Sequence, residues 1–316
     1  MKFSNEILDL ENKISELINF SKEKKIDLSS EVEKLSRERD ELLKISYAEM
    51  TDWDRVSIAR HPERPYTLDY IENMTTDFIE LHGDRLCKDD AAIVGGLCKI
   101  EGQKVMIIGH QKGRTIEENI FRNFGMASPE GYRKALRLFK MAERFSLPIV
   151  NLIDTAGAYP GIEAEKHGQG EAIARNLMEM SGLKVPVISV VIGEGGSGGA
   201  LALGVADKVY MLENAVYSVI SPEGCAAILY KDSSMAPEAA NNLKISAKSL
   251  QSLGIIDGIV KEPLGGAHRD YKCVANDLKS VILSSLLELL KLDVDTLLKN
   301  RYNKFRKMGS FLEKTI

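Results

Sequence analysis

The sequence predicts an α/β fold, and three observations point to it. Apolar runs of strand length alternate with segments of helical pattern between about residues 60 and 265. Helical apolar spacing also marks the residues before 50 and after about 276. A glycine-dense turn at 193–200 joins an apolar run to the start of a buried helix. Because such alternation is typical of a sheet with parallel strands, we expect a helical hairpin arm (1–50), an α/β domain (51–275) and a C-terminal helical extension (276–316).

Length and composition exclude several classes of protein. The 316 residues can bury a substantial core. The formal net charge of −4 gives no reason to expect nucleic acid or an anionic membrane as a partner. No apolar run reaches the roughly 18 residues of a membrane span, and Glu6 follows the N-terminus too closely for a signal peptide. We therefore expect a cytoplasmic protein that binds neither nucleic acid nor membranes.

The cysteines give no sign of a metal site. Cys87, Cys98, Cys225 and Cys273 are widely spaced and none belongs to a C-x-x-C pair. Zinc sites and disulfide frameworks can be recognised in a sequence by closely or regularly spaced cysteines. We therefore expect no metal ligands in this chain and a reducing compartment.

The N-terminal segment predicts a helical hairpin. Its first apolar seam is interrupted by a polar break at 21–25 and followed by a second seam. Two amphipathic helices with a short link favour an antiparallel pair that serves as a structural arm, and its seam can also grip a partner chain. The two seams consist of Phe3, Ile7, Leu10, Ile14 and Leu17, and of Leu28, Val32, Leu35 and Leu42.

The first half of the central domain opens after a proline boundary. Pro62 and Pro65 stop any helix or central strand. A helix is expected over 67–81, followed by strands at 91–100 and 104–109 that a short turn at 101–103 joins into a hairpin. The loop 110–114 then leaves the second strand with Lys112 and Arg114, and Arg122 lies nearby in the sequence. These cations either face an anionic ligand or belong to a solvated loop.

The remaining elements alternate in type. Two Ser-Pro-Glu-Gly sequences, at 128–131 and 221–224, place serine, proline and glutamate where helix starts favour them. Helices are expected at about 128–145, 169–180, 197–205, 236–253 and after 276, and strands at 148–153, 185–192, 208–212, 216–220 and 255–260.

The glycine-dense turn admits several interpretations. Bare backbone N–H groups at a helix start stabilise negative charge, either on a phosphate or in an oxyanion hole. The spacing Gly193-x-Gly195-x-x-Gly198 matches a dinucleotide fingerprint, with Glu213 placed where a ribose-binding acid would lie. Against this, Glu194 puts a carboxylate inside the turn, the following helix is short, and the unit lies in mid-chain.

A hydrolase nucleophile elbow is a further interpretation of the same turn. The spacing Gly195-x-Ser197-x-Gly199 matches G-x-S-x-G, with Ser197 as nucleophile. Of the five histidines, only His268 lies at a suitable place downstream, and it lies in a glycine-rich turn. The oxyanion hole fits more of the chain, since it needs no side-chain nucleophile.

Several long motifs resemble one family. They are the stretches 60–70, 106–114, 123–126, 129–137, 193–200, 217–225 and 263–269, which span nearly the whole chain. In these stretches the sequence resembles the α subunits of bacterial acetyl-CoA carboxylase carboxyltransferases. One departure is Ala156, where the resemblance leads us to expect proline.

The resemblance implies a fold, a reaction and partners. The fold is a crotonase-like (ClpP/crotonase) ββα superhelix. The reaction moves a carboxyl group from carboxybiotin, tethered to a biotin carboxyl carrier protein, to acetyl-CoA, giving malonyl-CoA in the first committed step of fatty acid biosynthesis. Implied partners are a zinc-ribbon-bearing β subunit in an α2β2 assembly, the carrier protein, and a biotin carboxylase, which uses the ATP.

The resemblance also implies site residues and a mechanism. Carboxybiotin releases CO2 and a ureido anion that the amides of Gly198 and Gly199 stabilise, and the biotin nitrogen then deprotonates the acetyl methyl group. Gly195 and Gly196, with Lys112, Arg114 and Arg122, are the expected cofactor-binding residues. We also expect Gly199→Val to abolish transfer without unfolding the domain.

Two other functions remain open at this stage. An autonomous crotonase-like hydratase or isomerase would need an acid–base carboxylate beside the hole, for which Glu194 and Glu223 are candidates. A noncatalytic dinucleotide-binding or scaffold protein is the other.

Overall fold

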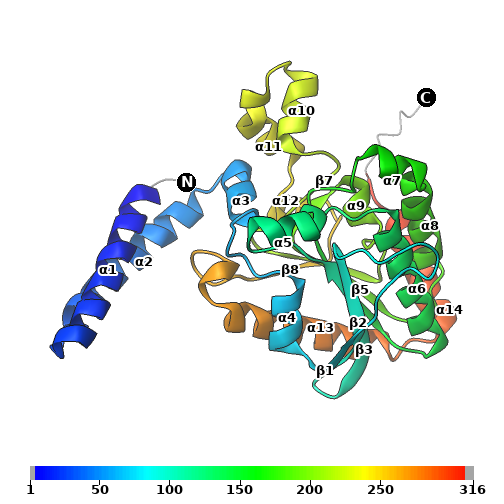
Figure 1. Cartoon of the computed structure of the whole chain (residues 1–316), viewed down its shortest axis with the longest axis horizontal. Helices are drawn as coiled ribbons and strands as arrows, with labels where there is room; N and C mark the ends of the chain where they lie inside the picture. The colour runs from blue at the N-terminus through cyan, green and yellow to red at the C-terminus, as the bar shows by residue number, and fades with distance from the viewer. Residues whose placement is uncertain (1–3, 310–316) are drawn as a thin grey trace, which may run out of the picture.

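The computed structural model describes residues 4–309, which form an α/β fold around one mixed sheet (Figure 1). The strand order is β1-β2-β3-β4-β5-β6-β8, and β7 pairs with the end of β5. The first three strands are antiparallel, and the pairs from β3 through β4, β5 and β6 to β8 are parallel. The carboxyl ends of the parallel strands therefore share one edge of the sheet, the usual place of a ligand site in such folds.

The strands largely follow the predicted apolar runs. They are β1 (Thr76–Glu80), β2 (Ile93–Ile100), β3 (Gln103–His110), β4 (Ile149–Thr155), β5 (Val187–Gly196), β6 (Lys208–Leu212), β7 (Val216–Ser218) and β8 (Gly258–Val260). The expected 91–100 and 104–109 hairpin is confirmed as β2–β3. The strands expected at 216–220 and 255–260 are shorter, and β5 continues beyond 192 into the glycine turn.

The helices cover the sheet on both sides. They are α1 (Ser4–Lys24), α2 (Ser29–Ala48), α3 (Asp52–Ala59), α4 (Thr67–Met74), α5 (Ile116–Phe121), α6 (Pro129–Arg144), α7 (Ile162–Lys166), α8 (Gln169–Ser181), α9 (Ser197–Leu201), α10 (Pro222–Leu229), α11 (Ala236–Leu243), α12 (Ala247–Ser252), α13 (Tyr271–Leu289) and α14 (Val294–Arg306). In Figure 1, α4 and α13 lie on one side of the sheet and α6, α8 and α14 on the other. The helix expected over 236–253 is interrupted between α11 and α12.

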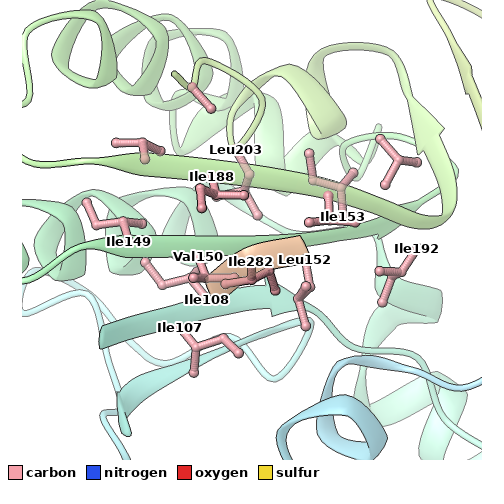
Figure 2. Close-up of a cluster of buried hydrophobic side chains, with 14 of the residues drawn as sticks. Ile107, Ile108, Ile149, Val150, Leu152, Ile153, Ile188, Ile192, Leu203 and Ile282 are labelled. Atoms are coloured by element: carbon pink, nitrogen blue, oxygen red, sulfur yellow. The ribbon is translucent and has the colours of Figure 1, made fainter. Parts of the chain in front are cut away.

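The core lies between these layers. Figure 2 shows Ile107 and Ile108 of β3 beside Val150 and Leu152 of β4, with Ile282 of α13 close to Val150 and Leu152. All five side chains are fully buried. Strands covered on both faces carry continuous apolar runs rather than alternation, which is why these segments were recognisable as strands from sequence.

The N-terminal hairpin is confirmed. Helices α1 and α2 pack side by side and extend away from the body of the molecule (Figure 1). Ile7, Leu10 and Ile14 of the first seam are buried, while Phe3 lies outside the described residues. A salt bridge of 2.6 Å from Glu11 Oε1 to Arg269 Nη2 fastens the arm to the body.

One predicted element is wrong. The helix expected over 67–81 ends at Met74, and the chain continues as β1 after an extended Thr75. β1 pairs with β2, and a Cβ atom at Gly96 of β2 would lie 2.1 Å from the carbonyl oxygen of Ile79. Pairing with a neighbouring strand thus overrides the helical spacing of the apolar residues.

The domain division stays a proposal. The expected boundary at 275/276 falls inside α13, and buried residues of α13 such as Leu278 and Leu286 belong to the main core. The C-terminal helices therefore pack as part of the central domain. None of the helices within residues 4–309 is long and apolar enough to cross a membrane.

Candidate active site

The glycine turn lies where the central strand passes directly into a helix. β5 ends at Gly196 and α9 begins at Ser197, whose φ of +50° is left-handed. The first N–H groups of a helix have no partner within it and are aligned with its positive dipole end. The turn therefore presents amide donors at the carboxyl edge of the sheet.

Most glycines of the turn are required by packing. A Cβ atom at Gly196 would lie 2.1 Å from the carbonyl oxygen of Ala156, and one at Gly199 would lie 2.6 Å from the amide nitrogen of Ala158. At Gly195 the ring of Tyr217 would be 2.8 Å away. These three glycines let the turn approach neighbouring segments closely. A side chain at Gly199 would meet backbone that cannot move aside cheaply, so Gly199→Val is expected to strain the domain, and whether the domain stays folded remains a prediction.

Gly198 is different. A Cβ atom there would meet only methyl groups of Ile173, at 3.5 and 3.6 Å, which is ordinary contact. The residue is half-buried, its φ is not positive, and it lines a cavity together with Ser197. Neither backbone conformation nor packing requires glycine at this position. The remaining physical reason for glycine is that a ligand in the cavity can reach the backbone amide without meeting a side chain.

The cavity beside Gly198 is apolar and of ligand size. Its volume is about 410 Å³, and its walls come from β7, α11, α12 and the end of α14 as well as from the turn. The lining side chains include Tyr217, Leu243, Ile245, Leu250 and Phe305. A mostly apolar cavity with a few polar groups at one end is the usual form of a small-molecule site.

Charged side chains surround the other side of the turn. Arg60 Nε lies 2.7 Å from Glu194 Oε1, and Arg60 Nη1 lies 2.5 Å from Glu223 Oε1. Burial alone would raise the pKa of Glu223, but hydrogen bonding from Arg60 holds it below its ordinary value. Both carboxylates named as possible acid–base groups are thus paired with one guanidinium.

The predicted cationic residues also have internal partners. Lys112 Nζ lies 2.6 Å from Asp154 Oδ1, and although burial would lower the pKa of Lys112, the Asp154 carboxylate raises it. Asp154 Oδ1 in turn accepts a 2.9 Å hydrogen bond from the amide of Glu194. Lys112 therefore supports the glycine turn from behind.

Arg114 and Arg122 make their contacts outside the glycine turn. Arg114 Nη2 lies 2.5 Å from Asp69 Oδ2, and its guanidinium stacks 4.1 Å above the ring of Tyr66. Arg122 Nη1 donates to the carbonyl of Ala91 at 2.9 Å. These contacts assign both arginines to loop structure, and their expected contact with a cofactor stays a prediction.

Sequence reasoning missed a buried ion pair below the turn. Arg64 and Glu262 are fully buried and joined by contacts of 2.6 and 3.1 Å. Arg64 Nε also donates to the carbonyl of Ile192 at 2.7 Å. The pair thus joins the end of β5 to two segments that carry Arg64 and Glu262. Because these two residues are 198 positions apart in the sequence, no local pattern could have indicated the ion pair.

His110 was also missed. Its side chain is fully buried beside the backbone of Leu152 and Gly199. Burial lowers the pKa of His110 to about 4, against the opposing effect of Asp154. The imidazole is therefore neutral at pH 7 and packs behind the first turn of α9.

The nucleophile elbow lacks a base. The positive φ of Ser197 matches that geometry, but the histidines have other surroundings. His61 stacks on His268 with ring centroids 3.9 Å apart, and His82 and His167 contact acidic side chains. His110 is fully buried beside the backbone of Leu152 and Gly199, and no hydrogen bond joins Ser197 to a histidine within residues 4–309.

The dinucleotide fingerprint also lacks its context. α9 spans only five residues, and Glu194 is held by Arg60 within the turn. Glu213, the proposed ribose-binding acid, accepts a 3.3 Å hydrogen bond from the amide of Glu262. An oxyanion hole is the interpretation that the geometry favours.

Comparison with known proteins agrees with this geometry. The acetyl co-enzyme A carboxylase carboxyltransferase-like family model matches residues 1–309. The acetyl-coenzyme A carboxylase carboxyl transferase subunit alpha of Fusobacterium nucleatum subsp. nucleatum is 68% identical over 311 residues, covering 98% of this chain and 99% of that protein. The protein of the same name from Geobacillus sp. (strain WCH70) is 58% identical, with coverage of 98% and 96%.

Solved structures show the same fold at low sequence identity. The β subunit of geranyl-CoA carboxylase from P. aeruginosa has a TM-score of 0.56 at 18% identity, covering 83% of this chain and 48% of that one. A Pseudomonas malonate decarboxylase hetero-tetramer in complex with coenzyme A has a TM-score of 0.57 at 15% identity, with coverage of 69% and 88%. The expected crotonase-like fold is confirmed by these neighbours. With the family model and both relatives spanning nearly its full length, the chain belongs to the acetyl-CoA carboxylase carboxyltransferase-like family.

Proposed function

We propose that this chain is the α subunit of an acetyl-CoA carboxylase carboxyltransferase, which carboxylates acetyl-CoA to malonyl-CoA in fatty acid biosynthesis. The observation that carries the proposal is full-length similarity, at 68% identity, to a protein of that name. The glycine turn and its cavity supply a site suited to this chemistry. The donor in this proposal is carboxybiotin on a biotin carboxyl carrier protein.

The residues present fit such a donor. When bound, carboxybiotin supplies the carboxyl group that acetyl-CoA receives. The apolar cavity would hold a mostly uncharged bicyclic body and exclude water, since its walls are Leu243, Ile245 and Phe305 among others. The amides of Gly198 and Gly199 would donate hydrogen bonds to the oxygen on which negative charge develops. Gly195 and Gly196 let the turn pack closely against Tyr217 and Ala156, and this packing would hold those donors in place.

The charged groups have a positioning role in this proposal. Arg60 holds Glu194 on one side of the turn, and Asp154 holds the amide of Glu194 on the other. Neither carboxylate that a hydratase or isomerase would need is free, since Glu194 and Glu223 both pair with Arg60. The pairing favours carboxyl transfer, which needs no side-chain base in this chain, over autonomous hydration.

We extend the proposal to the partners. A zinc-ribbon-bearing β subunit would complete the site in an α2β2 assembly and supply the oxyanion hole for the acetyl-CoA enolate. A biotin carboxylase would load the carrier at the expense of ATP. These partners are inferred from the family relationship.

Reconstitution tests the function. Purified α chain, β subunit and carboxylated carrier protein are mixed with acetyl-CoA, and malonyl-CoA is measured by mass spectrometry. We expect product from the mixture and none from either chain alone. Hydration of crotonyl-CoA by the lone α chain would instead establish the hydratase alternative, and tight NADH binding would establish the dinucleotide alternative. Absence of malonyl-CoA from a mixture in which the two subunits co-elute would refute the proposal.

A further inference from the structure

A second cluster of chemically reactive side chains lies outside the candidate active site. Cys87, Glu130 and His167 each place one potential ligand atom within 4.8 Å of the other two. They come from the loop before β2, the first turn of α6 and the residue that ends α7. The sequence did not indicate this cluster, because its members are 43 and 37 residues apart along the chain.

Glu130 is the buried member of the cluster. Its side chain is 1% exposed, and its Oε1 lies 2.7 Å from His167 Nδ1 and 3.1 Å from Arg133 Nη2. Its Oε2 is buried and has no hydrogen-bond partner among residues 4–309. A buried carboxylate oxygen without a partner is costly. A carboxylate with one vacant oxygen, within reach of a thiol and an imidazole, indicates a missing ligand.

The other two members are held in place by the backbone around them. Asp84 Oδ1 accepts hydrogen bonds from the amides of Leu86, Cys87 and Lys88, at 2.9, 2.8 and 3.1 Å, which fixes the loop that carries the Cys87 thiol. The carbonyl of His167 accepts a 2.9 Å hydrogen bond from Arg133 Nη1. Both side chains are solvent-accessible, so an ion can enter from solvent.

We propose that Cys87, Glu130 and His167 bind one divalent transition-metal ion of the zinc type. Sulfur, imidazole nitrogen and carboxylate oxygen form a donor set that suits Zn²⁺, whereas Mg²⁺ and Ca²⁺ prefer oxygen alone. On binding, the Cys87 thiol loses its proton to solvent, and the thiolate and the Glu130 carboxylate neutralise the two positive charges of the ion. The Nδ1 lone pair of a neutral His167 completes the protein ligands, and water takes the fourth position.

The surrounding charges are compatible with a cation. The Arg133 guanidinium contacts Glu130, but Asp84 Oδ2 lies 3.1 Å from Arg133 Nε and offsets its charge. Asp89 likewise lies 2.8 Å from Lys134 Nζ and offsets the charge of that residue. Lys88 is a further cation that acts on Glu130. The carboxylates of Glu130, Asp84 and Asp89 balance the charges of Arg133, Lys88 and Lys134, so the cluster carries no net positive charge.

The ion would link the outer loops to the support of the glycine turn. Gln169 lies two residues after His167, and its side-chain amide donates to the carbonyls of Ala127 and Tyr159, each at 2.9 Å. Tyr159 directly follows Gly157 and Ala158, whose backbone packs against Gly199. The ion would act as a structural staple at this position. This inference is independent of the proposed function.

Cobalt binding to the full-length α chain tests the site. The chelator-treated protein is titrated with Co²⁺, and the thiolate-to-cobalt charge-transfer absorption is recorded in the near ultraviolet, followed by displacement with Zn²⁺. We expect one ion per chain. Cys87→Ser should abolish the charge-transfer band, and His167→Gln should weaken binding at least about tenfold, the loss typical even of second-layer partners.

A matched variant separates this site from a generic thiol. Cys273→Ser removes another exposed cysteine and should leave the band and the affinity unchanged. Zn²⁺ should also raise the melting temperature of the wild-type chain but not that of Cys87→Ser. Absence of the band in the wild type, or binding that both Cys87→Ser and His167→Gln retain, would overturn the assignment. Circular dichroism establishes that the variants are folded.

Discussion

At the scale of single residues, Gly198 stands apart from the other glycines of the turn. Gly196 and Gly199 are needed because backbone of the 156–158 segment approaches within 2.1 and 2.6 Å of their missing Cβ positions. Gly198 has room for a side chain and borders the apolar cavity. A structural role and a ligand-facing role can therefore be separated by substitution.

We predict that substitution of one proposed donor lowers activity and that substitution of the other lowers stability. Gly198→Val should reduce carboxyl transfer by about 10²-fold, the loss typical of one disturbed oxyanion donor, with little change in melting temperature. Gly199→Ala should instead cost about 1–3 kcal/mol of unfolding free energy, because its Cβ collides with backbone. Steady-state kinetics of the reconstituted complex and calorimetry measure the two effects. Full activity of Gly198→Val would remove this amide from the mechanism.

The burial of His110 predicts that the free energy of unfolding decreases in acid. Its pKa is lowered by burial to about 4 from an ordinary 6.5. The unfolded chain therefore binds a proton between pH 6.5 and 4 that the folded chain excludes, and folding stability falls as pH falls through that window. At about 1.4 kcal/mol for each pKa unit the upper limit is about 3 kcal/mol.

His110→Gln should reduce this decrease in stability. Urea unfolding at pH 7 and pH 4.5 should show a smaller loss of stability in the variant than in the wild type. His82→Gln, which replaces an exposed histidine, serves as the control and should keep the wild-type difference. An unchanged pH dependence in His110→Gln would contradict the burial of a neutral imidazole.

At the scale of elements, the two Ser-Pro-Glu-Gly sequences show how far a local motif determines structure. Each begins a helix, as predicted. Ser221 Oγ accepts a 3.1 Å hydrogen bond from the amide of Gly224, whereas Ser128 makes no such side-chain cap and its amide donates to Asp90. Glu130 of the first sequence is buried beside His167, and Glu223 of the second pairs with Arg60. The motif fixes the helix start, and its neighbours decide what the glutamate does.

The elements that sequence reasoning misjudged share a cause. The apolar spacing of the 67–81 segment predicts one helix, but β1 forms by pairing with β2. β5 continues into the glycine turn because Glu194, Gly195 and Gly196 pair with β7. In both cases the deciding hydrogen bonds come from a strand distant in sequence or not apparent from local periodicity.

At the scale of the whole molecule, the Arg64–Glu262 pair joins the segment after α3 to the loop after β8. Both side chains are fully buried, and Glu262 also accepts hydrogen bonds from Asn214 and from the amide of Ala267. Burial of an ion pair is stabilising overall only when such additional partners are present. The pair thus holds these two segments together at the carboxyl end of the parallel strands.

Breaking this pair should destabilise the whole domain. Arg64→Met leaves a buried, unpaired carboxylate and should cost about 3–5 kcal/mol of unfolding free energy. The double variant Arg64→Met/Glu262→Gln should recover part of that loss, because no buried charge remains. Lys99→Met, which breaks an exposed pair with Asp77, should change stability by less than about 1 kcal/mol. Thermal unfolding of the variants measures all three, and a loss in Arg64→Met no larger than in Lys99→Met would contradict this role.

The sequence by itself determined the fold class, most of the parallel strands, the hairpin arm, the glycine turn and the family. These follow from local signals: continuous apolar runs, seams at helical spacing, glycine density and ordered motifs. Tertiary structure alone decided that Lys112 and Arg114 face carboxylates of this chain, that His110 is buried and neutral, and that Cys87, Glu130 and His167 meet. The physical reason is that charge pairing, desolvation and ligand geometry depend on distances between segments far apart in the chain, which only the packed sheet and its helices define.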